Sequence, residues 1–139
     1  MPILPIDTGR HGTPEMRRIF EEENRVQKML DVEAALAWAH AEVGDFPRKD
    51  AEKIMAMAST KYVKIARIKE IEREIKHDVA SLVRALSEVC GSSGGYVHLG
   101  ATSYDIVDTA NALQLKDALS LIGKRLDEFE KVLIEKAVK

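Results

Sequence analysis

Apolar side chains recur at steps of three and four residues through most of the chain, which is the spacing of one face of a helix. The pattern predicts helices over residues 14–44, 48–58, 63–75 and 78–90, the first of them interrupted near Asn24. Thr13 followed by Pro14 is typical of a helix start, and Gly44 followed by Pro47 is typical of a helix end. No strand pattern competes with these helices, so the predicted fold class is all-α.

The last predicted helix starts near Ser103 and continues to Lys139. Its apolar residues alternate steps of four and three, which is the pattern of a coiled-coil heptad. We call these residues the seam: Leu115, Leu119, Ile122, Leu126, Phe129 and Leu133. A helix of roughly 35 residues would be about 50 Å long. The preceding residues are too few to cover such a rod, so the seam is expected to pack on helices from further chain or from other subunits.

The composition of the chain argues against several classes of binding partner. The net charge is −2 with both signs interspersed, so nothing favours nucleic acid or an anionic membrane. The single cysteine, Cys90, excludes an intramolecular disulfide framework. No apolar run approaches a membrane span, and the first residues lack the basic region of a signal peptide, so a soluble, cytoplasmic protein is expected.

The stretch from Tyr96 to Leu113 carries the clearest local motif. Thr102 and Asp105 are three residues apart, which is the spacing of a capping box at a helix start. Thr102 and Ser103 either cap the helix and do nothing more, or also offer a carboxylate the free N–H groups and the positive dipole end of that helix. The glycine-rich run 91–95 predicts a loop. It lacks the Lys-Ser/Thr ending of a nucleotide P-loop and follows a helix instead of a strand.

Four histidines are candidates for chemistry: His11, His40, His77 and His98. His40 lies within a predicted helix, where a surface or packing role is expected. His77 lies at the junction of two predicted helices, where Asp78 is expected to cap the second helix while His77 points away from it. One junction histidine is usually structural, but two near loop-to-helix transitions favour a shared site. A metal is not expected, because the histidines have no ligand spacing and no accompanying cluster.

Four segments together carry a resemblance to a known family. They are 9–16 (GRHGTPEM), 31–37 (DVEAALA), 76–79 (KHDV) and 98–110 (HLGATSYDIVDTA). In this order they resemble the adenylosuccinate lyases of the fumarase/aspartase superfamily, over roughly the first third of a family member. The resemblance implies an N-terminal helical domain over 1–100, followed over 101–139 by the truncated first long helix of a central helical bundle.

The resemblance also implies roles for particular residues. Thr102 and Ser103 match a pair that binds a carboxylate of the succinyl arm, and His98 matches a histidine that contacts or orients the substrate. Arg10 and His11 match a pair that contacts the nucleotide phosphate. Lys76, His77 and Asp78 match a triplet that lines the substrate pocket, with His77 near the reacting groups. The second residue of the phosphate pair is usually tyrosine, so His11 is a departure. His77 and His98 are thus expected as supporting catalytic groups.

The implied reaction is elimination of fumarate from adenylosuccinate and from the succinyl-carboxamide ribotide of purine synthesis, with no cofactor. In the family, the general acid and base lie further along the sequence, and each active site combines three subunits of a homotetramer. The 139-residue chain is therefore expected to be inactive alone. Two alternatives stay open. One is another superfamily lyase, such as an argininosuccinate lyase or a cycloisomerase relative, and the other is a non-catalytic helical module that associates through the seam.

Overall fold

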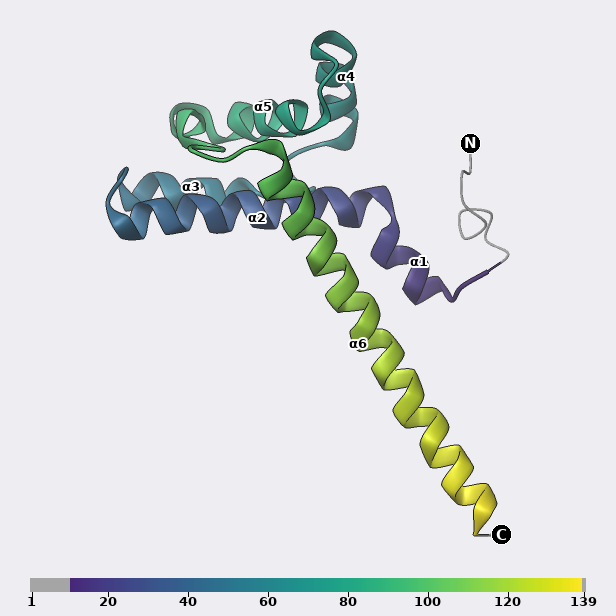
Figure 1. Ribbon diagram of the computed structural model, residues 1–139. Helices are drawn as coiled ribbons and strands as arrows, with labels where there is room; N and C mark the ends of the chain where they lie inside the picture. The colour runs from purple at the N-terminus through teal and green to yellow at the C-terminus, as the bar shows by residue number, and fades with distance from the viewer. Residues whose placement is uncertain (1–10, 139) are drawn as a thin grey trace.

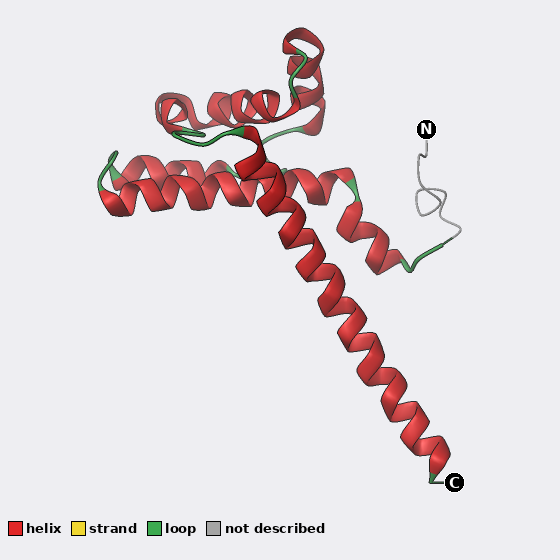
Figure 2. Cartoon of the chain, viewed as in Figure 1, coloured by secondary structure: helices red, strands yellow, loops and turns green. Residues whose placement is uncertain are grey.

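The computed structural model describes residues 11–138. This part of the chain contains helices and no strand, which confirms the predicted all-α class (Figure 2). The elements in order are α1 (Pro14–Phe20), α2 (Glu22–Val43), α3 (Arg48–Met57), α4 (Ile65–Ile75), α5 (Asp78–Cys90), the 3-10 helix η2 (Gly91–Tyr96) and α6 (Ser103–Ala137).

The predicted first helix is two helices, α1 and α2. Thr13 caps α1 as predicted, and its Oγ1 accepts the Met16 N–H at 3.2 Å. The interruption lies at Glu21, three residues before the predicted position. Asn24 accounts for the difference, because its Nδ2 donates to the Ile19 carbonyl at 2.7 Å and so satisfies a carbonyl that the break leaves without an intrahelical partner.

The predicted helices 48–58 and 78–90 are confirmed by α3 and α5, and α4 begins two residues later than predicted. The run 91–95 forms part of η2 instead of an irregular loop. Gly94 explains this local packing, because a Cβ at that position would lie 2.4 Å from the backbone oxygen of Ser87. Glycine therefore lets η2 lie directly against α5.

The core lies where the helices cross near the start of α6 (Figure 1). Helices α2 and α3 run side by side, α4 packs on α5, and the first part of α6 packs on α2. The largest fully buried apolar side chains come from all of these helices: Leu30, Ile54, Ile71, Leu82, Leu86 and Ile106. This packing brings the starts of α5 and α6 to the same side of α2.

Helix α6 confirms the predicted long helix and projects far beyond the other helices (Figure 1). All six seam residues are exposed, from 45% at Ile122 to 67% at Leu119. A row of apolar side chains this exposed is the pattern expected of an unpartnered interface. Within residues 11–138, no helix combines the length and the apolarity needed to span a membrane.

Candidate active site

Two helix N-termini meet at the candidate site. Ser103, the first residue of α6, has its Oγ 3.5 Å from Nε2 of His77, the residue before α5. Each helix start carries N–H groups without intrahelical acceptors and the positive end of a dipole. Two such ends together form a surface suited to a ligand with several negative oxygens.

The structure corrects the prediction that Asp78 caps α5. His77 is the cap, since its Nδ1 accepts the Ala80 N–H at 3.2 Å, while the Asp78 carboxylate accepts the adjacent Val79 N–H at 2.8 Å. Asp78 is already the first helical residue and so lies one position too late to cap. Because Nδ1 of His77 accepts a hydrogen bond, the proton of the neutral ring lies on Nε2, which faces Ser103.

The start of α6 has the predicted capping box. The Thr102 N–H donates to Asp105 Oδ2 at 2.8 Å, and the reciprocal contact of the Thr102 side chain is also present. Thr102 is exposed and Ser103 is half-buried. Capping therefore fixes the direction of α6 and leaves the Ser103 hydroxyl beside His77.

His98 lies in the turn before α6 and bonds to a residue that sequence patterns did not single out. Its Nδ1 is 2.7 Å from Oε1 of Glu33, which is 1% exposed on α2. Burial raises the pKa of Glu33, and the hydrogen bond and charge of His98 oppose that shift. The sequence signal that could have identified Glu33 is its position: it is a charged residue within the apolar face of α2, between Leu30 and Ala37.

His40 holds the same turn from the end of α2. Its Nδ1 bonds to Asp45 Oδ2 at 2.5 Å and its Nε2 donates to the Leu99 carbonyl at 2.9 Å. The packing role expected for His40 is therefore a specific one, since the ring ties the turn between His98 and Gly100 to α2. The Asp45 hydrogen bond raises the pKa of His40, and the bond to the Leu99 carbonyl acts in the same direction.

We expect this clamp to weaken as pH rises. A histidine whose pKa is raised by folding adds stability that is complete below its unfolded value of about 6.5 and is lost above its folded value. His40→Gln should therefore lower the melting temperature by about 2–5 °C at pH 5.5 and by less at pH 8.5. Thermal unfolding at the two pH values measures the difference. Asp45→Asn should reproduce the pH-dependent part of the decrease in melting temperature. An equal decrease at both pH values would contradict the expectation.

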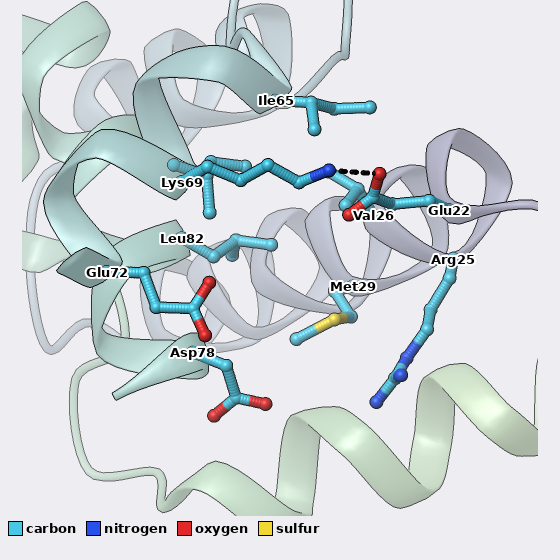
Figure 3. Close-up of a pocket in the computed structure, with 10 residues that line it drawn as sticks. Glu22, Arg25, Val26, Met29, Ile65, Lys69, Glu72, Asp78 and Leu82 are labelled. Atoms are coloured by element: carbon cyan, nitrogen blue, oxygen red, sulfur yellow. Dashed lines mark hydrogen bonds and ion pairs between the residues drawn. The ribbon is translucent and has the colours of Figure 1, made fainter. Parts of the chain in front are cut away.

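Asp78 and Lys76 border two adjoining hollows at the α4–α5 junction, and the linings of both hollows include Lys69 and Glu72. Asp78 lines a cavity of about 120 Å³ between α2, α4 and α5, where Glu72 lies beside it and Lys69 pairs with Glu22 at 2.6 Å on the other side of the hollow (Figure 3). Lys76, in the left-handed conformation with φ 56°, borders an open hollow together with Lys69, Glu72 and Arg73. Positive charge therefore predominates on the Lys76 side.

Of the N-terminal pair, the structure describes only His11, and it does not bring His11 to this cluster. Arg10 lies outside the described residues. His11 is exposed, and the adjoining Gly12 and Thr13 line a hollow with Leu121 and Ile122 of α6. That part of α6 is roughly 27 Å along the helix from Ser103. Within one chain, the direct contact at the site is between His77 and Ser103, with Lys76 and Asp78 next to His77 in sequence, Thr102 next to Ser103, and His98 in the turn that leads to α6.

Two other kinds of chemistry find no support in residues 11–138. No group of three or more His, Cys, Asp or Glu side chains there is arranged to hold a metal ion. Cys90 is buried, and burial raises the pKa of its thiol to about 11. The thiolate that nucleophilic chemistry requires is therefore disfavoured.

The sequence profile of a family described as Lyase matches residues 9–139. Because the match extends over nearly the whole sequence, the chain belongs to this lyase family. Its helical fold agrees with solved structures of similar proteins. A 3-carboxy-cis,cis-muconate lactonizing enzyme from Pseudomonas putida matches with a TM-score of 0.82 and 38% identity, over 90% of this chain and 30% of the other. A fumarate lyase from Mesorhizobium matches with a TM-score of 0.77 and 36% identity, over 85% of this chain and 28% of the other.

Similar sequences carry a more specific name. The adenylosuccinate lyase of Pyrococcus abyssi is 57% identical over 139 residues, which is 100% of this chain and 31% of the relative. The adenylosuccinate lyase of Methanocaldococcus jannaschii is 55% identical over 138 residues, 99% of this chain and 30% of the relative. The chain thus spans about a third of the length of these relatives.

Proposed function

We propose that this chain supplies substrate-binding groups to an adenylosuccinate lyase. That enzyme would eliminate fumarate from adenylosuccinate to give AMP, and from succinylaminoimidazole carboxamide ribotide to give AICAR. The observation that carries the proposal is the meeting of two helix starts, with Ser103 Oγ 3.5 Å from His77 Nε2. The names of the relatives from Pyrococcus abyssi and Methanocaldococcus jannaschii supply the substrate.

The chemistry accounts for a site of this kind. Elimination removes a proton from a carbon beside a carboxylate, and the negative charge that develops spreads onto that carboxylate. Fixed donors such as the Thr102 and Ser103 hydroxyls and the first N–H groups of α6 stabilise this charge as it grows. His77 and His98 assist by binding and orienting the reacting groups, while the main general acid and base lie further along the family sequence.

The nucleotide phosphate requires a separate group of cations. Lys76 lies in the hollow that Lys69 and Arg73 also border, next to His77 in sequence. Lysine and arginine side chains favour phosphate over a neutral ligand. Arg10 and His11, which match the phosphate pair of the family, would then serve the site of another subunit, because Gly12 and Thr13 lie beside the middle of α6.

The assembly and its setting belong to the same proposal. We place the protein in the cytoplasm as a homotetramer without a cofactor, in which exposed seams of α6 pack on one another. The exposure of all six seam residues supports association. A site that combines subunits also accounts for the distance between His11 and the cluster at Ser103.

Adenylosuccinate cleavage, followed by absorbance, tests the proposal. The assay compares the 139-residue chain with the longest reading frame that contains it. We expect cleavage by the longer protein and none by the chain alone. Cleavage by the short chain would locate a catalytic acid and base among its own residues, with His77 and His98 the first to replace.

A second candidate is favoured by the solved structures. The lactonizing enzyme from Pseudomonas putida, at 38% identity, acts on a carboxy-muconate by its name, so a cycloisomerase would use the same carboxylate-binding helix start. Activity of the longer protein on 3-carboxy-cis,cis-muconate, and none on adenylosuccinate, would favour this candidate. Self-association without activity on adenylosuccinate, argininosuccinate or muconate would favour the non-catalytic module.

A further inference from the structure

Glu33 is a costly residue for the core of this fold. It lies on the inward face of α2 between Leu30 and Ala37, which are 0% and 2% exposed. Moving a carboxylate from water to such a place is strongly unfavourable unless hydrogen bonds compensate. In agreement, burial is the main cause that raises the pKa of Glu33.

The compensation is incomplete. Oε1 of Glu33 receives one hydrogen bond, from His98 Nδ1 at 2.7 Å. Oε2 is buried, and no residue in the range 11–138 bonds to it. A buried polar group with one partner stabilises a fold less than a leucine of similar size would. Packing alone therefore does not account for a glutamate at this position.

The partner of Glu33 is held in an uncommon conformation. His98 has φ 65°, in the left-handed region that residues other than glycine seldom adopt, and Gly100 follows with φ 69°. Two contacts with α2 hold this turn: the Glu33–His98 bond and the bond from His40 to the Leu99 carbonyl. Since Glu33 and His40 are seven residues apart on α2, they lie on one face of that helix.

A carboxylate determines which ring nitrogen carries the proton. In its ionised form it only accepts hydrogen bonds, so beside ionised Glu33 the neutral ring of His98 bears its hydrogen on Nδ1. Nε2 then keeps its lone pair, and it becomes a donor when the ring is protonated. No residue within 11–138 bonds to Nε2, so this nitrogen is available to a ligand.

We propose that Glu33 is a positioning residue that acts through His98, holding its ring in the Nδ1–H tautomer beside the start of α6. This role rests on the proposed function, because it assigns to His98 a ligand at that site. It also explains why a destabilising carboxylate lies in the core: Glu33 serves the orientation of His98 and not the stability of the fold.

Two substitutions at Glu33 separate positioning from packing. Glu33→Leu removes the acceptor and the buried charge, and Glu33→Gln keeps an acceptor oxygen without the charge. In the longest reading frame containing the chain, the Glu33→Leu variant should have a kcat/KM for adenylosuccinate lower by about tenfold or more. The Glu33→Gln variant should lose less. The melting temperature of the Leu variant should stay equal or rise. Glu23→Leu, at an exposed position of the same helix, is the matched control and should leave kcat/KM unchanged.

The tautomer itself can be measured without any substrate. Long-range ¹H–¹⁵N correlation spectra of protein labelled with ¹⁵N-histidine should report Nδ1–H for His98 in the native chain and a mixture in Glu33→Leu. The proposal would be overturned by an Nε2–H tautomer of His98 in the native protein. It would also be overturned if kcat/KM of the Glu33→Leu variant lay within threefold of the native value. Loss of activity that merely parallels loss of stability in both variants would assign Glu33 a structural role and also overturn it. If the native protein has the Nδ1–H tautomer but does not cleave adenylosuccinate, the proposed function fails, while the control of the His98 tautomer by Glu33 stands.

Discussion

Replacing His77 by Asn in the longest reading frame that contains this chain is expected to lower kcat/KM for adenylosuccinate cleavage by about 100-fold or more. The imidazole lies 3.5 Å from the Ser103 hydroxyl, between the starts of α5 and α6, where a developing carboxylate charge would be bound. Asparagine removes Nε2 from that position. Initial rates over a range of substrate concentrations measure the loss.

Asparagine is chosen because His77 has two roles that must be separated. Its Nδ1 caps α5 by accepting the Ala80 N–H. Asn is among the best capping residues, so His77→Asn should keep the melting temperature close to the native value. His77→Ala loses both groups and should also destabilise the protein by about 1 kcal/mol. Near-native activity of the Asn variant, beside an impaired Ala variant, would mean that His77 serves only as a cap.

The helices could be predicted from the sequence because their signals are local. Spacing of apolar residues, the Thr13–Pro14 start and the capping box at Thr102 each act within a few residues, and all three are confirmed. The misplaced break at Glu21 also has a local cause, but it depends on which carbonyl the Asn24 side chain reaches. A residue's type does not determine that choice.

The site could be predicted only in part, because its contacts join distant segments. His77 and Ser103 are 26 residues apart, and Glu33 and His98 are 65 apart. A single sequence shows which residue types are present. It does not show how α2, α5 and α6 cross, and that crossing brings these residues together. The resemblance to known lyases supplied His77, His98 and Ser103 as candidates, whereas Glu33 emerged only from its burial and its bond to His98.

Leu126→Asp is expected to abolish self-association of the longer protein. Leu126 lies in the middle of the seam and is 60% exposed in the single chain, so the fold of one subunit should tolerate the change. In an interface of packed leucines, the same carboxylate would be buried without a partner, which costs several kcal/mol for each copy. Molar mass from light scattering should therefore fall to that of a monomer.

The matched control is Lys124→Asp, which introduces the same carboxylate two residues earlier. It lies on the opposite side of α6, among the charged residues Asp127, Glu128 and Lys131, and should leave the molar mass unchanged. Activity then decides whether assembly completes the site. Leu126 is roughly 35 Å along the helix from Ser103, too far to act on it directly. If the Leu126→Asp variant loses both assembly and cleavage, sites shared between subunits are favoured. A fully active monomer would locate the whole site in one chain. An unchanged molar mass would mean that the seam is not an interface.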